Sequence, residues 1–338
     1  MNGLQPADLP PAGPPPDAGA HGGDGPAIAA WLGVSPDAIL DLSASLNPVA
    51  PDPLRVVAQH LTSIRRYPAA ITLASATRAL AEAIGAEPER LLLTNGGAEA
   101  IALAGAELGG CVAEPDFALY PRGGGPRWRS NPHNPTGLLA GPEMTVEVWD
   151  EAFYPLATGA WTRGDPGSVV VGSLTKLLAC PGLRLGYLLA DPALVASCRA
   201  HQPAWSVNGL AAAALPDLLG TVDLAGWSAD VATLRDELAG LLRRHGLQPL
   251  PSDACWLLVP APALRAQLAQ YGIVVRDCGS FGLPGVVRIA VPDEDGLTRL
   301  DNALTKLSQQ RPRPGGSAGC GRRTGSLPAS GSAVTSST

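Results

Sequence analysis

Short apolar runs alternate with helical patterns through the middle of the sequence, and this alternation limits the fold more than any other feature. The runs are RLLLT (90–94), GCVAEP (110–115), VEVWDEAF (146–153), SVVVGSLTK (168–176) and LRLGYLLA (183–190). A helical pattern, NGGAEAIALAGAEL (95–108), follows the first run. Strands that alternate with helices predict a mostly parallel sheet with helices on both faces. The expected fold class is therefore α/β.

A second, smaller α/β unit is predicted near the end of the chain. An Ala- and Leu-rich helical region follows Pro192, and then come ACWLLVPA (254–261), ALRAQLAQYG (263–272), IVVRDC (273–278), VVRIAVP (286–292) and DEDGLTRLDNALTKL (293–307). The last stretch has leucines at helical spacing, with Asp293 as its expected cap. Composition predicts disordered tails at 1–20 and 311–338. The predicted division between them is an N-terminal segment (21–66), a large domain (67–192), and an interdomain helix with a small domain (193–310).

Composition excludes several classes of function. The net charge of −6 gives no basic patch, so nucleic acid is not an expected partner. No apolar run has the length of a membrane span, and no basic start with an apolar stretch marks a secretory signal. The six cysteines are scattered without a CxxC pair, which predicts a reduced, cytoplasmic chain without a metal site.

Polar groups follow several of the predicted strands, where open parallel sheets bind their ligands. NGGAEA (95–100) is a glycine turn that opens a helix, a geometry that suits a phosphate. DEAF places Asp150 at a strand end, SLTK places Ser173, Thr175 and Lys176 at another, and NPHNPTG (131–137) is a rigid loop with amide side chains. Each feature alone has a plain alternative: most such glycine turns are only turns, and most lone lysines lie at the surface.

Together and in this order, NPHNPTG, DEAF and SLTKLLACPGLRLGY resemble the signatures of the fold-type-I enzymes that use pyridoxal phosphate, the aspartate aminotransferase superfamily. The resemblance covers about residues 36–307. It implies that Lys176 bonds covalently to the cofactor aldehyde and that Arg184 grips the cofactor phosphate. A desolvated amine near another cation has a lowered pKa and is a better nucleophile.

The resemblance implies further cofactor contacts, residue by residue. Asp150 pairs with the pyridine nitrogen, and Asn134 bonds the ring hydroxyl. Phe117, in EPDFALY, lies on the face of the ring. The remaining expected phosphate contacts are the backbone of Gly97, Ala98 and Glu99, the hydroxyls of Ser173 and Thr175, and Tyr67 of RRYP reaching from a neighbouring subunit. The last contact implies a homodimer with shared active sites.

Substrate contacts are also implied. Arg288, in VVRIAV, matches the arginine that clamps a substrate carboxylate, although such a residue can also be a plain strand-edge arginine. HGGD (21–24), DLSASLNPVAP (41–51) and VVRDCGSFGLPGVVRIAV (274–291) together resemble the threonine-phosphate decarboxylase branch, a relative of histidinol-phosphate aminotransferases. In that branch Arg276 and Arg288 suit a substrate with a carboxylate and a phosphate. Asn47 and His21 are further expected substrate contacts, unless His21 belongs to a tail.

Three functions stay open on these residues. The first is a decarboxylase of threonine phosphate in cobalamin biosynthesis, which is favoured because Phe153 stands where histidinol-phosphate enzymes commonly have a tyrosine. The second is a class I/II aminotransferase that acts on a phosphorylated substrate. The third is a degenerate member that binds the cofactor without catalysis. The choice between the first two depends on which bond of the substrate is held perpendicular to the cofactor ring, and the sequence does not give that angle.

One departure from the family pattern concerns the ten residues between Tyr120 and Asn131, PRGGGPRWRS. Relatives place a helix and a further strand there. A crossover between parallel strands normally needs at least about 10–12 residues, including its helix. The sheet of the large domain is therefore expected to be abbreviated.

Overall fold

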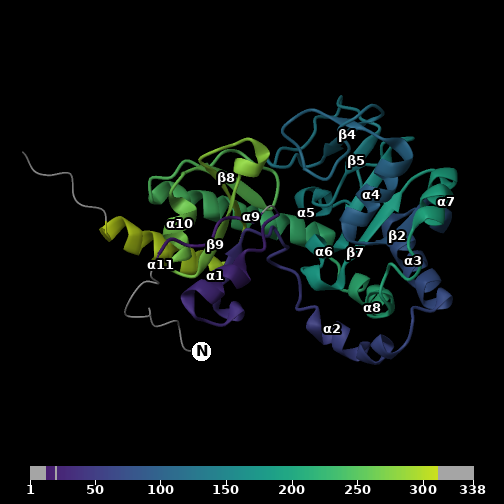
Figure 1. Cartoon of the computed structure of the whole chain (residues 1–338), viewed down its shortest axis with the longest axis horizontal. Coiled ribbons are helices and arrows are strands. Elements are labelled where there is room, and N and C mark those ends of the chain that lie inside the picture. Colours follow the sequence, from purple (N-terminus) through teal and green to yellow (C-terminus); the bar gives the residue numbers. More distant parts are fainter. Residues whose placement is uncertain (1–12, 20, 311–338) are drawn as a thin grey trace, which may run out of the picture.

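The computed structural model describes residues 13–19 and 21–310. The predicted tail at 311–338 and most of the one at 1–20 lie outside these residues. The described chain forms two units side by side, each built on its own sheet (Figure 1).

The larger sheet has six strands in the order β2-β7-β6-β5-β4-β3. Their bounds are β2 (Leu91–Asn95), β7 (Leu185–Leu189), β6 (Val169–Ser173), β5 (Val148–Asp150), β4 (Arg127–Ser130) and β3 (Cys111–Val112). The neighbours from β3 to β6 are parallel, whereas β7 is antiparallel to both β6 and β2. The predicted mostly parallel sheet is confirmed.

Helices cover both faces of this sheet because successive strand residues point to opposite sides. Leu92, Val148 and Val171 pack on one side with α4 (Gly96–Leu108) and α7 (Pro192–His201). Leu93, Trp149 and Val170 pack on the other side, where the helices are α3 (Ala70–Ile84), α5 (Tyr154–Thr158), α6 (Leu174–Leu177) and α8 (Gly209–Leu219). The result is a three-layered α/β unit, as the sequence predicts.

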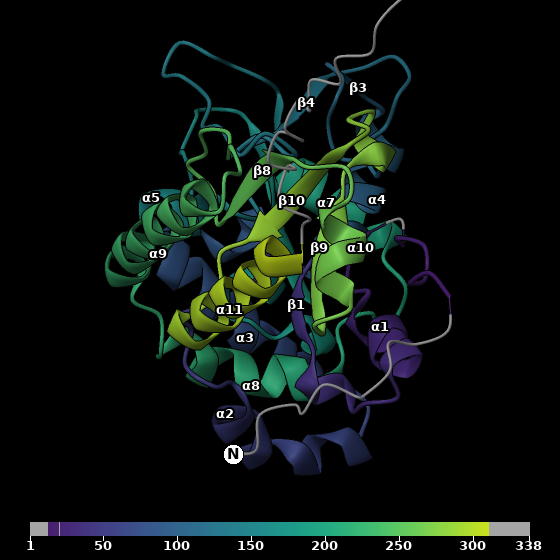
Figure 2. The ribbon, with the colours of Figure 1, turned by 90° about the vertical axis from the view of Figure 1, so that its left-hand side faces the viewer.

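The smaller sheet has the order β1-β9-β10-β8. Its strands are β1 (Leu40–Leu42), β9 (Ile273–Asp277), β10 (Val286–Ala290) and β8 (Trp256–Pro260). Only the pair of β1 and β9 is parallel. The helices of this unit are α1 (Gly25–Leu32), α10 (Leu264–Ala269) and α11 (Glu294–Gln310), the last begun by Asp293, whose Oδ1 accepts from the Gly296 N–H at 2.8 Å. The strands pack beneath α10, α11 and the long helix α9 (Leu224–Arg244) (Figure 2).

A single long helix, α9 (Leu224–Arg244), joins the two cores. Trp227 and Val231 near its start are buried in the core of the larger unit. Leu238 and Leu242 near its end are buried in the core of the smaller unit. A hydrophobic face that continues from one core to the next fixes the position of the smaller sheet beside the larger one.

Shorter elements complete the described chain: α2 (Leu54–Gln59) and the 3₁₀ turns Pro36–Ala38, Leu61–Arg65, Pro88–Arg90, Pro181–Leu183 and Gly279–Phe281. Within the described residues no single helix has the length and apolar composition to cross a membrane. Among the same residues, one pair, α8 and α9 with an 89° bend between them, has that length and composition when taken together.

The connection between β3 and β4 departs from the usual parallel crossover. It runs through residues 113–126, and this part of the described chain contains neither a helix nor a strand. The expected abbreviation at this point is therefore observed: β3 and β4 remain parallel neighbours although no helix connects them.

Candidate active site

An anion cradle forms where α4 begins, beside the ends of β2, β7 and β6. Gly186 pairs with both Thr94 and Ser173, so three strands meet at this point. A Cβ atom on Gly186 would overlap the backbone of Gly96 and Gly97, and a Cβ on Gly96 would lie 2.5 Å from the Arg184 guanidinium. Only glycine permits this close approach.

The cradle offers several donors to an anion. A helix that begins at Gly96 leaves the N–H groups of Gly96, Gly97 and Ala98 without partners inside the helix. The hydroxyls of Ser173 and Thr175 lie 2.7 Å from each other beside it. The side chain of Glu99 does not point to the cradle, because its carboxylate accepts from the Asn95 N–H, from the Gln202 amide and from the Ser206 hydroxyl. That side chain is therefore turned to the helix start and to the chain after α7.

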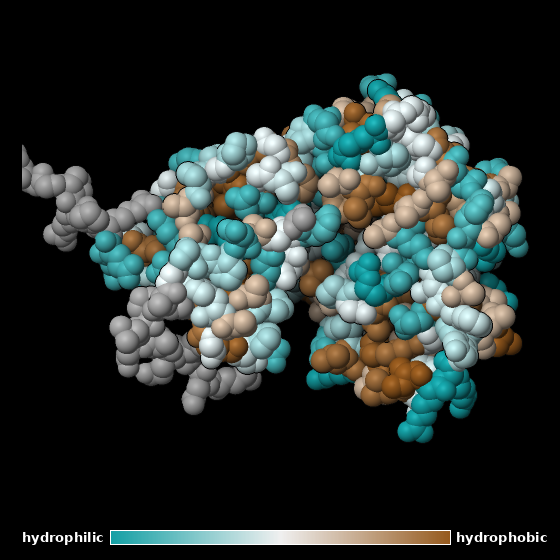
Figure 3. Space-filling model, in the orientation of Figure 1, coloured by the Kyte–Doolittle hydropathy of each residue, from teal (hydrophilic) through white to brown (hydrophobic). Residues whose placement is uncertain are grey.

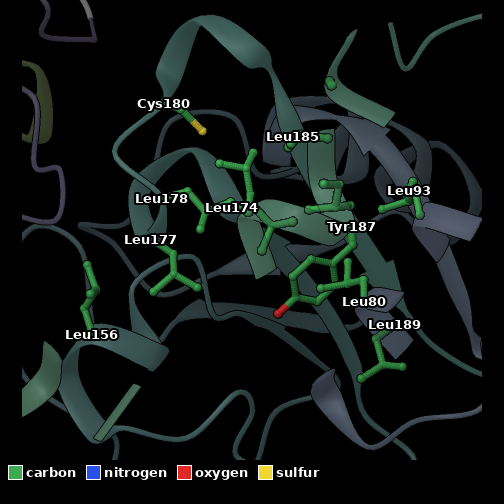
Figure 4. Close-up of a cluster of buried hydrophobic side chains, with 14 of the residues drawn as sticks. Leu80, Leu93, Leu156, Leu174, Leu177, Leu178, Cys180, Leu185, Tyr187 and Leu189 are labelled. Atoms are coloured by element: carbon green, nitrogen blue, oxygen red, sulfur yellow. The ribbon is translucent and has the colours of Figure 1, made fainter. Parts of the chain in front are cut away.

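Lys176 lies on the short helix α6, directly after β6. Leu174, Leu177 and Leu178 anchor this helix in the same buried cluster as Tyr187 (Figure 4). Burial lowers the pKa of Lys176, and the charges of Arg288 and Arg184 lower it further, whereas Cys255 and Asp150 act in the opposite direction. This environment favours a neutral, nucleophilic amine.

Asn47 makes two hydrogen bonds to the backbone of α6. Its backbone N–H donates to the Lys176 carbonyl at 3.0 Å, and its Nδ2 donates to the Leu177 carbonyl at 3.0 Å. Its Oδ1 accepts from the Val49 N–H. The structure thus places Asn47, an expected substrate contact, against the backbone that carries Lys176.

Asp150 ends β5, and its side chain is buried. Burial raises the pKa of its carboxyl to about 6. Its Oδ1 accepts from the Ala152 N–H at 2.9 Å, and its Oδ2 accepts from the Tyr120 hydroxyl at 2.8 Å. Tyr120 was not among the expected site residues, although EPDFALY places it three positions after Phe117 and their rings lie 5.6 Å apart.

Asn134 and Arg288 meet across the two units. Arg288 Nη1 donates to Asn134 Oδ1 at 2.8 Å, and its guanidinium lies 5.1 Å from the centre of the Trp256 ring. Phe153 packs edge-on against the same ring, at 4.7 Å. The Arg288 side chain is buried, its Nε has no hydrogen-bond partner among the described residues, and burial lowers its pKa to about 10.

Arg276, on β9, lies directly opposite Arg288 of β10. Because Ile273 and Val275 face the core of the small unit, the alternate residue Arg276 projects from the opposite face. It donates to the Gly19 carbonyl at 2.8 Å and to the Ser280 hydroxyl at 2.9 Å.

The segment around Gly19 also brings His21 to the site, where its ring centre lies 6.3 Å from that of Phe117. Tyr67 lies elsewhere: its side chain is exposed, and its ring packs on Trp205 at 4.6 Å. One chain therefore gathers all of the expected site residues except Tyr67 around the ends of the large sheet and the facing side of the small one.

Comparison with known proteins gives the family of the chain. The family model "Aminotransferase class I and II" matches residues 128–304. The chain is 31% identical to the threonine-phosphate decarboxylase of Salmonella typhimurium, over 86% of this chain and 98% of that protein. It is 26% identical to histidinol-phosphate aminotransferase 1 of Dechloromonas aromatica, over 82% and 92% of the two chains.

Solved structures share the fold. The histidinol-phosphate aminotransferase of Sinorhizobium meliloti, in complex with pyridoxal-5'-phosphate, superposes with a TM-score of 0.71 at 19% identity, covering 84% of this chain and 94% of that one. The L-threonine-O-3-phosphate decarboxylase of Porphyromonas gingivalis gives 0.66 at 23% identity, covering 80% and 100%. Together with the family match and the relative from Salmonella, these findings show that the chain belongs to the class I and II aminotransferase family.

Proposed function

We propose that this protein is a pyridoxal-phosphate-dependent decarboxylase of an amino acid that carries a phosphate, with L-threonine O-3-phosphate as the substrate. The family is one of enzymes that use this cofactor. The observation that carries the choice of substrate is the pair of buried arginines, Arg276 and Arg288, on adjacent strands. Two guanidinium groups side by side suit a ligand that bears two anions.

The described residues fit the cofactor. The cradle at Gly96 and Gly186 is shaped so that no Cβ atom occupies it, and Arg184 supplies a cation there. Asp150 would pair with the pyridine nitrogen and Asn134 with the ring hydroxyl, while Lys176 supplies the amine that attaches the cofactor. When bound, the cofactor ring withdraws electrons from the substrate carbon. Phe117 would cover one face of the ring.

The Nε of Arg288, which has no hydrogen-bond partner among the described residues, supports a contact with a substrate carboxylate. An N–H that is buried without a partner costs about 1–3 kcal/mol, and a carboxylate oxygen at this position would relieve that cost. The Trp256 ring fixes the guanidinium in place. Arg276, which donates to Ser280 and to the Gly19 carbonyl of the segment that carries His21, would then take the phosphate. In this arrangement Lys176 is the group that moves protons at the reacting carbon.

An aminotransferase of histidinol phosphate is the second candidate, supported by relatives of that name at 26–32% identity. Phe153 favours the first candidate. Its ring packs on Trp256 and carries no hydroxyl for the cofactor ring. Histidinol phosphate also has a phosphate but no carboxylate, so it would leave one of the two arginines without an anion.

The test uses the purified, cofactor-loaded protein with phosphothreonine and with histidinol phosphate plus 2-oxoglutarate. The proposal expects carbon dioxide and an amino-alcohol phosphate from the first substrate and no glutamate from the second. Glutamate without carbon dioxide would establish the aminotransferase instead. Neither product, from protein that retains its cofactor, would contradict both candidates.

We also infer a homodimer with shared sites. Leu54, Ile64, Tyr67, Ile71 and Trp205 are 59–78% exposed. They lie on α2, the turn after it, the start of α3 and the loop before α8, where hydrophobic surface gathers in Figure 3. An exposed apolar area of this kind marks an interface. Ile71→Asp should convert a dimer to a monomer in sedimentation, and a wild-type monomer at micromolar concentration would contradict the inference.

A further inference from the structure

The turn at residues 116–120, on a connection that has no helix, carries Phe117 and contacts Asp150 and Ser130 of the proposed cofactor site. Tyr120 of this turn donates to the Asp150 carboxylate. Asp116 Oδ1 accepts from the Ser130 hydroxyl at 2.6 Å, and the oxygen of that hydroxyl accepts from the Asn134 N–H at 2.7 Å. A shift of the turn would therefore disturb the partners of both the ring nitrogen and the ring hydroxyl.

Arg122 contacts nearly every carbonyl of this turn. Its Nη1 donates to the carbonyls of Ala118 at 2.9 Å and Tyr120 at 2.8 Å. Its Nη2 donates to the carbonyls of Asp116 at 3.4 Å and Phe117 at 3.2 Å. Its Nε donates to Glu114 Oε1 at 2.6 Å. A guanidinium has five N–H donors in a rigid fork, so this set uses all five.

The contacts replace what a crossover helix would supply. In a helix, carbonyls are satisfied by N–H groups of the following turn. Between β3 and β4 the described chain has no helix, and the carbonyls of residues 116–118 and 120 converge on one side chain, with the Tyr120 N–H as a second donor to the Phe117 carbonyl. A planar, delocalised cation suits this task, whereas the ammonium of a lysine is a point charge with three donors.

We propose that Arg122 is a positioning residue for the cofactor site: it holds the 116–120 turn, and through it Tyr120 and Asp116, in place of the missing crossover helix. The inference deepens the proposed function and rests on it for the link to the cofactor. The ion pair with Glu114 contributes little by itself, because both side chains are more than a third exposed. The carbonyl contacts carry the effect.

The test compares Arg122→Lys with Arg243→Lys, a matched change at an exposed arginine on the last turn of α9. In cofactor-free protein, amide hydrogen exchange at residues 116–120 should rise in Arg122→Lys alone. The affinity for pyridoxal phosphate should fall about tenfold to a hundredfold, as expected for the loss of two or three hydrogen bonds that hold a site. Glu114→Gln should stay within about threefold of the wild type, as an exposed ion pair allows.

A spectroscopic measurement distinguishes a positioning role of Arg122 from a purely structural one. The pH midpoint of the absorbance change of the bound cofactor reports on the electrostatics around Asp150 and Lys176. It should move in Arg122→Lys and stay unchanged in Arg243→Lys. A lower melting temperature with an unchanged midpoint and unchanged exchange at 116–120 would overturn the inference. If the wild type itself binds no pyridoxal phosphate, the proposed function fails, while the exchange experiment still decides whether Arg122 holds the turn.

Discussion

Arg276 and Arg288 are direct partners across the antiparallel strands β9 and β10, and both side chains are buried. Like charges directly opposite each other destabilise a sheet. The charge of Arg276 is one of the causes, after burial, that lower the pKa of Arg288. The Trp256 and Phe281 rings stabilise the Arg288 cation in part, and Phe281 lies 5.7 Å from Arg276 as well. A ligand with two anions would relieve the remaining repulsion.

This relationship predicts different effects for the two arginines. Arg276→Ala and Arg288→Ala should each lower kcat/KM for phosphothreonine by about 30-fold to several thousandfold, since removing one partner of a desolvated ion pair costs about 2–5 kcal/mol. With unphosphorylated threonine, one of the two variants should leave the weak residual activity almost unchanged, and that variant identifies the phosphate ligand. Steady-state kinetics on both substrates, with Arg243→Ala as control, make the comparison. Equal losses on both substrates would show that no phosphate is recognised.

Lys176 allows a sharp test because the chain has only one other lysine, Lys306, which lies on α11. Lys176→Ala should abolish covalent attachment of pyridoxal phosphate after borohydride reduction, read by intact mass and peptide mapping. Lys306→Ala should retain it. The melting temperature of cofactor-free Lys176→Ala should be equal or higher, because a partly buried amine next to two arginines is removed. A reduced adduct mapped to any other residue would contradict the assignment.

The sequence predicts the large sheet well because its motifs stand at strand ends, where parallel topology brings them together. Lys176 and Asp150 stand at such strand ends, whereas their expected roles, like that of Asn134, are what the family resemblance implies. The contact between Tyr120 and Asp150 could not be predicted in the same way, since it depends on the shape of an irregular turn. The pairing of β1 with β9 could not be predicted either, because a three-residue strand has too short a pattern to be assigned to either sheet.

Tyr120→Phe tests the residue that the sequence did not identify. The change removes the hydroxyl that donates to Asp150 and keeps the ring that packs on Trp128 and Phe117. A hydrogen bond to a charged group contributes about 1.5–3 kcal/mol, so the affinity for pyridoxal phosphate should fall about tenfold to a hundredfold. Absorbance titration measures it. Phe117→Leu, which removes the neighbouring ring but leaves the hydroxyl, should shift the pH midpoint of the bound cofactor less than Tyr120→Phe does.

The buried carboxyl of Glu151 should make the free energy of unfolding depend on pH. Its carboxyl is 1% exposed, accepts from the Arg163 N–H at 3.1 Å, and has a pKa that burial raises from 4.5 to about 7. Because the folded state then holds a proton that the unfolded state has lost, stability should fall as pH rises from about 4.5 to about 7, by on the order of 3 kcal/mol from this group. Glu151→Gln keeps an acceptor for the Arg163 N–H and removes the titration. Urea unfolding of the cofactor-free protein should therefore give a flatter pH profile for the variant and a higher free energy of unfolding above pH 7.5, whereas parallel profiles for the two proteins would show that Glu151 is charged in the folded state.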